Sequence, residues 1–281
     1  VGCEMDKNIK LLLIGGGKMG SALLEGWLKS GLVTKQLCVQ EPNPAAALTA
    51  LGLDVVPQAG PDFSPDIVVF AIKPQMAAQV IPDVAATLPE ACLVISLMAG
   101  TSIATLRDLA GAKHHFIRTM PNTPAALGRG ISALVAEPEV PADLRDAAEW
   151  LMQAVGDTVW LSREDQINAV TAISGSGPAY VFHMAEALAG SGEALGLEPA
   201  IAKRLAYQTV SGAGTMLDVA VAGPDVDAGQ LRRDVTSPGG TTEAALGILA
   251  CETGLGDLMR RTTSAAFQRA RDLARPEDEK N

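Results

Sequence analysis

A glycine-rich segment near the start of the chain has the residue types and spacing of an anion-binding loop. Residues 15–20 read GGGKMG, which fits G-x-G-x-x-G, follows an apolar run and opens a helical pattern at 18–30. In that context Gly15 makes a tight turn, Gly17 lets backbone approach a pyrophosphate, and Gly20 lets the helix pack on the strand. Unpaired N–H groups at the helix start then bind the phosphates, unless the segment is only a glycine-rich turn. The candidate dinucleotide contacts are Gly15, Gly17, Lys18, Met19 and Gly20.

Glu41 follows the next apolar run and bears on the choice of dinucleotide. It lies beyond Gly20 at about the 20-residue spacing expected for the acid that binds the ribose. A carboxylate there accepts hydrogen bonds from the 2′-hydroxyl of NAD and repels the 2′-phosphate of NADP. No Arg or Lys stands between Glu41 and Lys73 to pair with such a phosphate. The sequence therefore favours NADH over NADPH, the alternative being a surface glutamate in a turn.

Two further segments follow predicted strands and should share the carboxyl edge of the sheet, where ligands bind. Lys73 could reach a phosphate or ribose, or could be a solvated lysine at a helix start. The segment at 120–124, MPNTP, has two prolines that make a rigid loop, which we expect to line the nicotinamide side. The candidate cofactor contacts in these segments are Ala71, Ile72, Lys73, Pro74, Met120 and Asn122.

A second anion-binding loop is predicted late in the chain. Residues 236–242 read TSPGGTT and precede the helical run at 243–250. The N–H groups around Gly239–Thr242 have no partner inside the helix, so with Ser237 they can bind a carboxylate. The alternative is an ordinary N-cap in which Thr241 or Thr242 caps the helix. Two glycines and three hydroxyls exceed what a cap needs, which favours a site.

A third segment, SGSGPA at 174–179, is expected to be a loop that leads into a helix at the junction of two domains. Its small residues would let a flat ring lie against the backbone, and Ser174 is a candidate substrate contact. The alternative is a hinge with a helix cap, and both roles can hold together.

The elements that position these segments differ between the two parts of the chain. Short apolar runs alternate with helical patterns up to residue 162, which predicts an α/β domain with a mostly parallel sheet covered on both faces. After residue 162 apolar positions follow helical spacing, and no strand is predicted. The expected domains are 1–162 and 163–281. The expected strands are 10–14, 36–40, 67–72, 92–96, 116–119, 131–135 and 158–161. The expected helices are 18–30, 44–51, 75–88, 102–109, 141–155, one from Pro178, 199–221, 227–235, 242–251 and 254–274.

Composition excludes several classes of protein. Of 281 residues, 48% are apolar and 19% charged, which suits a packed core and not a disordered chain. The net charge of −10 disfavours a surface for nucleic acid or an anionic membrane. Four scattered cysteines and three histidines give no metal-binding pattern and no disulfide framework. No apolar stretch approaches the ~18 residues of a membrane span, and no signal peptide is recognised, so a soluble cytoplasmic protein is expected.

The chain resembles the pyrroline-5-carboxylate reductase family over nearly its whole length. The segments that carry the resemblance are LLLIGGGKMG (11–20), FAIKP (70–74), MPNTPAALGRG (120–130), ISGSGPAYVF (173–182) and LRRDVTSPGGTT (231–242). The last two are highly specific to that family. The resemblance implies an N-terminal Rossmann-like dinucleotide-binding domain and an all-helical C-terminal dimerisation domain, with a homodimer that often assembles further.

The resemblance also implies roles for individual residues. It assigns the grip on the substrate carboxylate to Ser237, Gly239, Gly240 and Thr241, and a hydrogen bond to the ring nitrogen to Thr242. The substrate is then L-1-pyrroline-5-carboxylate, whose imine carbon accepts hydride from NAD(P)H to give L-proline in the last step of proline biosynthesis. Lys18 stands where the family often has asparagine.

Two other functions fit parts of the pattern. A β-hydroxyacid or imine reductase of the same architecture needs a lysine at the helix start after residue 170, where 174–177 offers none. A nonenzymatic NAD-sensing or scaffold protein could share the fold, because fold alone does not fix function. The intact segment from Ser237 to Thr242 argues against that reading.

Overall fold

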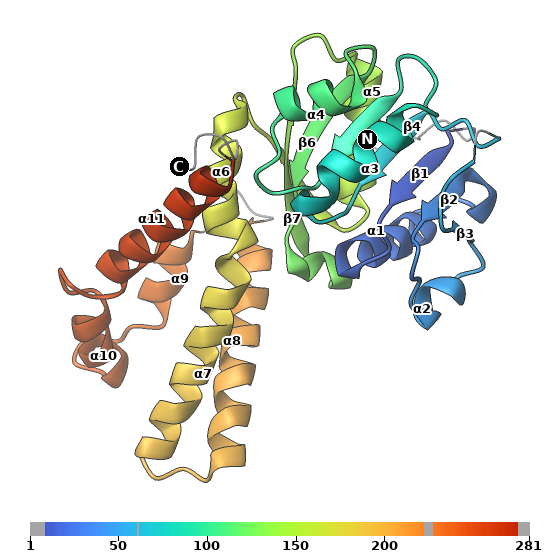
Figure 1. The fold of residues 1–281 in the computed structure, drawn as a ribbon. Coiled ribbons are helices and arrows are strands. Elements are labelled where there is room, and N and C mark those ends of the chain that lie inside the picture. Colours follow the sequence, from blue (N-terminus) through green and yellow to red (C-terminus); the bar gives the residue numbers. More distant parts are fainter. Residues whose placement is uncertain (1–8, 61, 222–226, 275–281) are drawn as a thin grey trace. The chain divides into compact units, whose positions relative to one another are not determined.

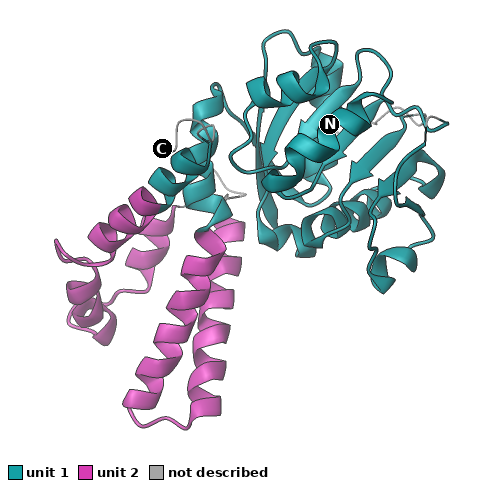
Figure 2. Ribbon diagram, in the orientation of Figure 1, with its two compact units in different colours: residues 1–176, 266–281 teal, residues 177–265 magenta. Residues whose placement is uncertain are grey.

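The computed structural model describes residues 9–60, 62–221 and 227–274, and divides the chain into two compact units. One unit comprises residues 1–176 and 266–281, and the other comprises residues 177–265 (Figure 2). The predicted domain boundary at 162/163 lies before this division and stays a prediction.

The first unit is built on an eight-stranded sheet with the order β3-β2-β1-β4-β5-β6-β7-β8 (Figure 1). Neighbouring strands are parallel, except that β6 and β7 are antiparallel. The strands are β1 Leu11–Ile14, β2 Leu37–Gln40, β3 Asp54–Val56, β4 Ile67–Phe70, β5 Leu93–Ser96, β6 His115–Met120, β7 Gly130–Ala136 and β8 Gly156–Trp160. The first six follow the strand order of a dinucleotide-binding Rossmann fold, with the topological switch point between β1 and β4.

Helices cover both faces of the sheet, because the strands are apolar on both sides. In β1, Leu11 and Leu13 belong to the core cluster that includes side chains of α1 and α5. Leu12 and Ile14 point the other way, into the cluster that includes side chains of α3 and α4. The helices of this unit are α1 Lys18–Lys29, α2 Ala46–Thr49, α3 Ala77–Ala85, α4 Ile103–Ala110, α5 Ala142–Gln153 and α6 Ile167–Val170.

Each predicted strand is present, and the mostly parallel sheet is confirmed. Two features were not predicted. The strand at Asp54–Val56 is an edge strand of only three residues and is partly exposed, so it lacks a buried apolar run. The antiparallel direction of β7 was also missed, because a single strand's composition carries no information about its direction.

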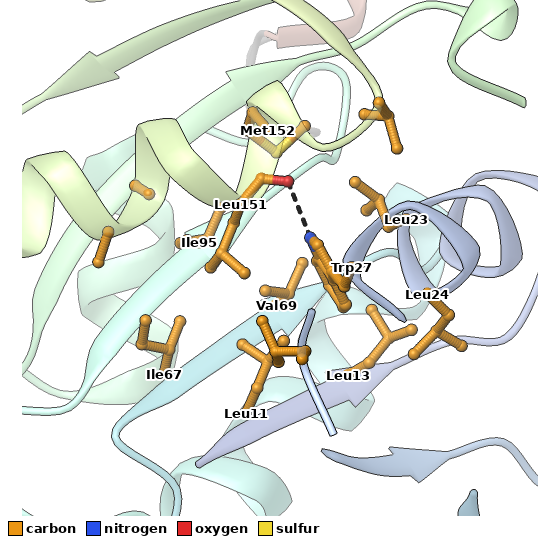
Figure 3. Close-up of a cluster of buried hydrophobic side chains, with 14 of the residues drawn as sticks. Leu11, Leu13, Leu23, Leu24, Trp27, Ile67, Val69, Ile95, Leu151 and Met152 are labelled. Carbon is orange, nitrogen blue, oxygen red and sulfur yellow. Dashed lines mark hydrogen bonds between the residues drawn. The ribbon is translucent and has the colours of Figure 1, made fainter. Parts of the chain in front are cut away.

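Trp27 ties α1 to the end of α5 within one core cluster (Figure 3). Its side chain is fully buried, and its indole Nε1–H donates to the carbonyl oxygen of Leu151 at 2.8 Å. That carbonyl is in the last turn of α5, where carbonyls have no partner inside the helix. The indole therefore both fills the core and caps α5.

Trp27→Phe is expected to lower the free energy of unfolding by roughly 1–3 kcal/mol, because the buried Leu151 carbonyl loses its donor. Chemical denaturation at a fixed protein concentration measures this. Trp150→Phe is the matched control, since Trp150 is only partly buried in the same cluster. An equal or larger loss for the control would contradict the capping role.

The second unit is helical, and no strand occurs among its described residues. The long helices α7 and α8 lie side by side as a hairpin (Figure 1). The helices are α7 Gly177–Ala194, α8 Pro199–Val221, α9 Ala228–Asp234, α10 Thr241–Leu249 and α11 Leu255–Ala274, whose C-terminal part belongs to the first unit. Each predicted helix is present within a few residues.

The prediction of a loop at 174–177 was wrong. A wide π-helical turn occupies Thr171–Gly175, and α7 begins at Gly177. The N–H of Ser176 donates to the carbonyl of Thr171 at 2.8 Å, and the hydroxyl of Ser174 donates to the carbonyl of Val170 at 3.2 Å. Small side chains fit such a turn as well as a loop. Wide turns of this kind often mark functional sites.

Candidate active site

The first glycine loop joins β1 to α1 at the switch point of the sheet. Gly15 has a φ of +103°, and a Cβ there would lie 2.8 Å from the carbonyl oxygen of Ala71. A Cβ at Gly20 would lie 2.1 Å from the carbonyl oxygen of Gly15. Gly17 differs, because a Cβ there would meet nothing within 4 Å. Two of the glycines are therefore required by the fold, and Gly17 faces open space.

The start of α1 carries a row of unpaired amides. Gly17 is the N-cap and has no side chain to cap the helix. The backbone N–H groups of residues 17–20 have no hydrogen-bond partner among the described residues. Such amides at a helix start bind phosphate oxygens, and the open space at Gly17 admits them. This cradle fits the pyrophosphate of a dinucleotide.

Glu41 lies against this loop and not free in a surface turn. Its Oε2 accepts a hydrogen bond from the N–H of Gly16 at 2.9 Å, and its Oε1 accepts one from the N–H of Asn43 at 3.0 Å. The carboxylate is thus fixed at the carboxyl end of β2, beside the glycine loop. Its predicted contact to the ribose stays a prediction.

The segment Ala71–Pro74 follows β4, which is paired with β1. The N–H of Ala71 donates to the carbonyl of Ile14 at 2.8 Å, so the strand end lies directly beside the glycine loop. Ile72 lies close to Gly15. Lys73 is exposed and precedes a short 3-10 turn that begins at Pro74. The structure brings these four predicted residues to the same edge as the loop.

Met120 and Asn122 lie at the end of β6, on the same carboxyl edge. The side-chain oxygen of Asn122 accepts from the N–H of Ile131 at 2.9 Å, so this residue also holds the connection to β7. A Cβ at Gly175 would lie 3.9 Å from the sulfur of Met120. The π-helical turn that contains Ser174 therefore passes the end of β6.

The second glycine loop belongs to the helical unit and leads into α10. The N–H of Gly240 donates to the carbonyl of Ser237 at 3.0 Å, which closes a four-residue turn. Pro238 and Gly239 are its central residues, and Gly239 has a φ of +71°. This is the sequence and conformation of a type II turn, in which the third position needs glycine.

The alternative of an ordinary threonine cap was wrong. The N-cap of α10 is Gly240, and no side chain caps the helix. The amides of Thr241, Thr242 and Glu243, and the hydroxyls of both threonines and Ser237, form no hydrogen bond within the described residues. An uncapped helix start with free hydroxyls beside it can bind a carboxylate.

Two of the predicted carboxylate donors already have partners. The amide of Gly240 is bonded to Ser237, and the amide of Gly239 donates to Oε2 of Glu243 at 2.7 Å. Glu243 also lines a cavity of about 490 Å³ with Arg232, Arg233 and Leu246. Sequence reasoning missed Glu243, although a glutamate in the first turn of a helix is a known signal for such a backward bond.

The groups with shifted pKa values lie outside both loops. Burial raises the pKa of the Cys38 thiol to about 11 and of the Cys92 thiol to about 12, so both are neutral. Burial also lowers the pKa of His114, whose ring nitrogens have no partner among the described residues. Across residues 9–60, 62–221 and 227–274, no group of three or more His, Cys, Asp or Glu side chains could hold a metal ion.

Comparisons with known proteins agree over both units. The family model for pyrroline-5-carboxylate reductase dimerisation matches residues 164–273, and the model for coenzyme F420-dependent NADP oxidoreductases matches residues 10–100. The pyrroline-5-carboxylate reductase of Pseudomonas aeruginosa is 38% identical over 269 residues, covering 94% of this chain and 97% of its own.

Solved structures give the same result. A pyrroline-5-carboxylate reductase from Coxiella burnetii has a TM-score of 0.86 and 35% identity, covering 96% of this chain and 100% of its own. The Plasmodium falciparum pyrroline carboxylate reductase, solved with NADP bound, has a TM-score of 0.81 and 28% identity, covering 96% and 99%.

Proposed function

This chain belongs to the pyrroline-5-carboxylate reductase family, and from that premise we propose how its two glycine loops share the reaction. The enzyme reduces L-1-pyrroline-5-carboxylate, a cyclic imine, to L-proline with NAD(P)H, the final step of proline biosynthesis. The observation that carries the proposal is the pair of helix starts, one at Gly17 and one at Gly240, that no side chain caps.

The first loop holds the dinucleotide. The amides of residues 17–20 bind the pyrophosphate, while Ala71–Pro74 lies beside the loop along the cofactor. Met120 and Asn122 line the nicotinamide side from the end of β6. When bound, the reduced nicotinamide supplies the hydride that the imine carbon accepts.

The second loop holds the substrate carboxylate. Because the amides of Gly239 and Gly240 have internal partners, the free amides of Thr241 and Thr242 and the hydroxyl of Ser237 are the donors. Gly239 contributes by leaving room for the carboxylate, since a Cβ there would meet nothing within 4 Å. Gly240 contributes by letting the turn close, since a Cβ there would lie 3.0 Å from the carbonyl oxygen of Ser237. Ser174 is a further proposed substrate contact.

Thr242 orients the ring through its nitrogen. Its hydroxyl forms no bond among the described residues and is free to contact the imine nitrogen. A threonine is a weak acid, so its role is positioning more than proton donation. The nitrogen takes its proton beforehand or from a hydroxyl or water nearby.

We propose that Glu41 gives a preference for NADH. Its fixed carboxylate would lie near a 2′-phosphate, and like charges at ~4 Å repel by several kcal/mol even at an effective dielectric of about 20. Glu41→Gln removes the charge and keeps one acceptor oxygen for the Gly16 amide, while the exposed bond from the Asn43 amide is lost. The ratio of kcat/KM for NADPH over NADH should rise ~10-fold or more.

Steady-state kinetics with both cofactors measure that ratio. Glu25→Gln is the control, because Glu25 lies on the exposed side of α1, paired with Lys29 at 3.6 Å, and its loss changes the net charge equally. A preference of the unchanged enzyme for NADPH would contradict the role of Glu41.

The helical unit forms a homodimer. Large apolar side chains of this unit are open to solvent in the single chain. Phe182 on α7 and Ile248 on α10 are 65% and 75% exposed, and Leu195, in the turn after α7, is 86% exposed. Exposed apolar surface of this extent marks an interface. Assembly beyond a dimer stays a prediction.

A cytoplasmic location is also proposed. Cys38, Cys92 and Cys251 are free thiols, as is usual in a reducing compartment. No helix in the described ranges is both long and apolar enough to cross a membrane.

The activity is tested by mixing the protein and pyrroline-5-carboxylate with NADH and, in parallel, with NADPH. The nicotinamide absorbance should fall, and proline should accumulate in equal amount. No oxidation with either cofactor would favour a protein that only binds the dinucleotide.

A further inference from the structure

We propose that Glu243 is a positioning residue for the substrate: its side chain holds the Gly239 amide and so keeps the carboxylate-binding loop in its binding form. The inference rests on the proposed role of that loop. Glu243 is not proposed to touch the substrate.

The contact joins the first turn of α10 to the turn before it. Oε2 of Glu243 accepts from the N–H of Gly239 at 2.7 Å, while the N–H of Gly240 donates to Ser237 at 3.0 Å. A glutamate at this helix position usually bonds to the N-cap amide. Here the N-cap amide is taken by the turn, so the carboxylate reaches one residue further back.

The bond matters because Gly239 is the least constrained point of the loop. Its φ of +71° is one of many conformations open to a glycine. Nothing within 4 Å of its missing Cβ limits it from outside. Among the described groups, the Glu243 carboxylate is the one that accepts from the Gly239 amide. This bond fixes the orientation of the Gly239 amide and therefore the direction of the residues on either side.

The placement of this carboxylate also decides which amides near the start of α10 are bonded internally and which are open to a ligand. Negative charge is favourable at a helix N-terminus, so an internal carboxylate could compete with the substrate for the same donors. Glu243 takes the amide of Gly239, outside the helix, and leaves those of Thr241 and Thr242 free. We infer that the acceptor oxygen, and not the charge, is what the loop needs.

The cofactor loop is built in the same way. Oε2 of Glu41 accepts from Gly16 at 2.9 Å, and the amides that follow, at 17–20, remain free. In each loop an internal carboxylate holds the backbone just before the amides that are open to a ligand.

Three variants of Glu243 distinguish the effect of its side-chain length from the effect of its negative charge. Glu243→Gln keeps the acceptor oxygen at the same distance without the charge, and Glu243→Asp keeps the charge but is too short to reach Gly239. Glu243→Ala removes both. The control is Glu198→Ala in the same unit. Glu198 directly precedes α8, and its carboxylate also accepts from backbone amides at a helix start, those of Ala200 and Ile201 at 3.1 and 3.2 Å.

The expected result is a KM for pyrroline-5-carboxylate that rises ~10-fold in the Asp and Ala variants, about 1.4 kcal/mol. The Gln variant and the Glu198 control should stay within about twofold of the unchanged enzyme. The KM for the dinucleotide should not move in any of them. If the Ala variant fails to fold, the Asp and Gln pair still decides.

An unchanged KM in Glu243→Asp, or a KM raised as much in Gln as in Asp, would overturn the proposal. Both outcomes require that the unchanged enzyme is active, so that each variant's KM can be compared with its KM. Failure of the proposed function would instead appear as no turnover in that enzyme.

Discussion

Gly17→Val is expected to raise the KM for the reduced dinucleotide ~100-fold or more, a loss of about 2.7 kcal/mol of binding, while the protein stays folded. Gly17 has a φ of −67° and ψ of −171°, which any residue can adopt. A Cβ there meets nothing within 4 Å. Neither backbone nor packing requires a glycine, so the requirement we expect comes from the pyrophosphate that approaches this point.

Variants of two other glycines distinguish an effect on dinucleotide binding from an effect on folding. Gly20→Ala should impair folding, because its Cβ would lie 2.1 Å from a backbone oxygen that cannot move aside. Gly60→Val is the matched control, since Gly60 also faces open space but lies outside the loop. Thermal unfolding and the KM for the dinucleotide distinguish the three. A normal KM in Gly17→Val would remove the loop from the cofactor site.

Thr242→Ala is expected to reduce kcat/KM for pyrroline-5-carboxylate by roughly 10–100-fold, or ~1.4–2.7 kcal/mol. The hydroxyl has no partner among the described residues, so its removal breaks no contact of the folded chain. Alanine is also the better helix former, so stability should not fall. The loss therefore reports on alignment of the substrate ring.

The serine variant and a second threonine control this experiment. Thr242→Ser keeps the hydroxyl and should recover most of the activity. Thr215→Ala removes a hydroxyl that bonds to Ser211 within α8 and should leave the rate unchanged. An unchanged kcat/KM in Thr242→Ala would refute the positioning role.

Much of the fold follows from local patterns. The continuous apolar run at Ile67–Phe70, with helical patterns around it, predicts a strand in a sheet covered on both faces, and the helical spacing of apolar residues after residue 162 predicts helices such as the one at 199–221. The strand at Asp54–Val56 has no such signal, since pairing with β2 and not composition makes it a strand. The turn around Ser174 is likewise decided by backbone bonds that small residues do not encode.

More of the structure of the first glycine loop than of the second could be predicted from the sequence. The spacing of Gly15, Gly17 and Gly20 reflects fixed demands of one turn, so their roles in the backbone could be read directly. At Gly239 the amide is taken by Glu243, a side chain from the following helix turn. Which amides stay open to a ligand depends on that bond, and glycine spacing alone does not determine it.

The central claim is that hydride passes from a bound dinucleotide to the imine carbon of a substrate held at Thr242. The direct test uses NAD(P)H carrying deuterium at the transferred position, with proline analysed by mass spectrometry. We predict one deuterium in each proline, in equal amount to the nicotinamide oxidised. Proline without the label, or oxidation without proline, would contradict the account.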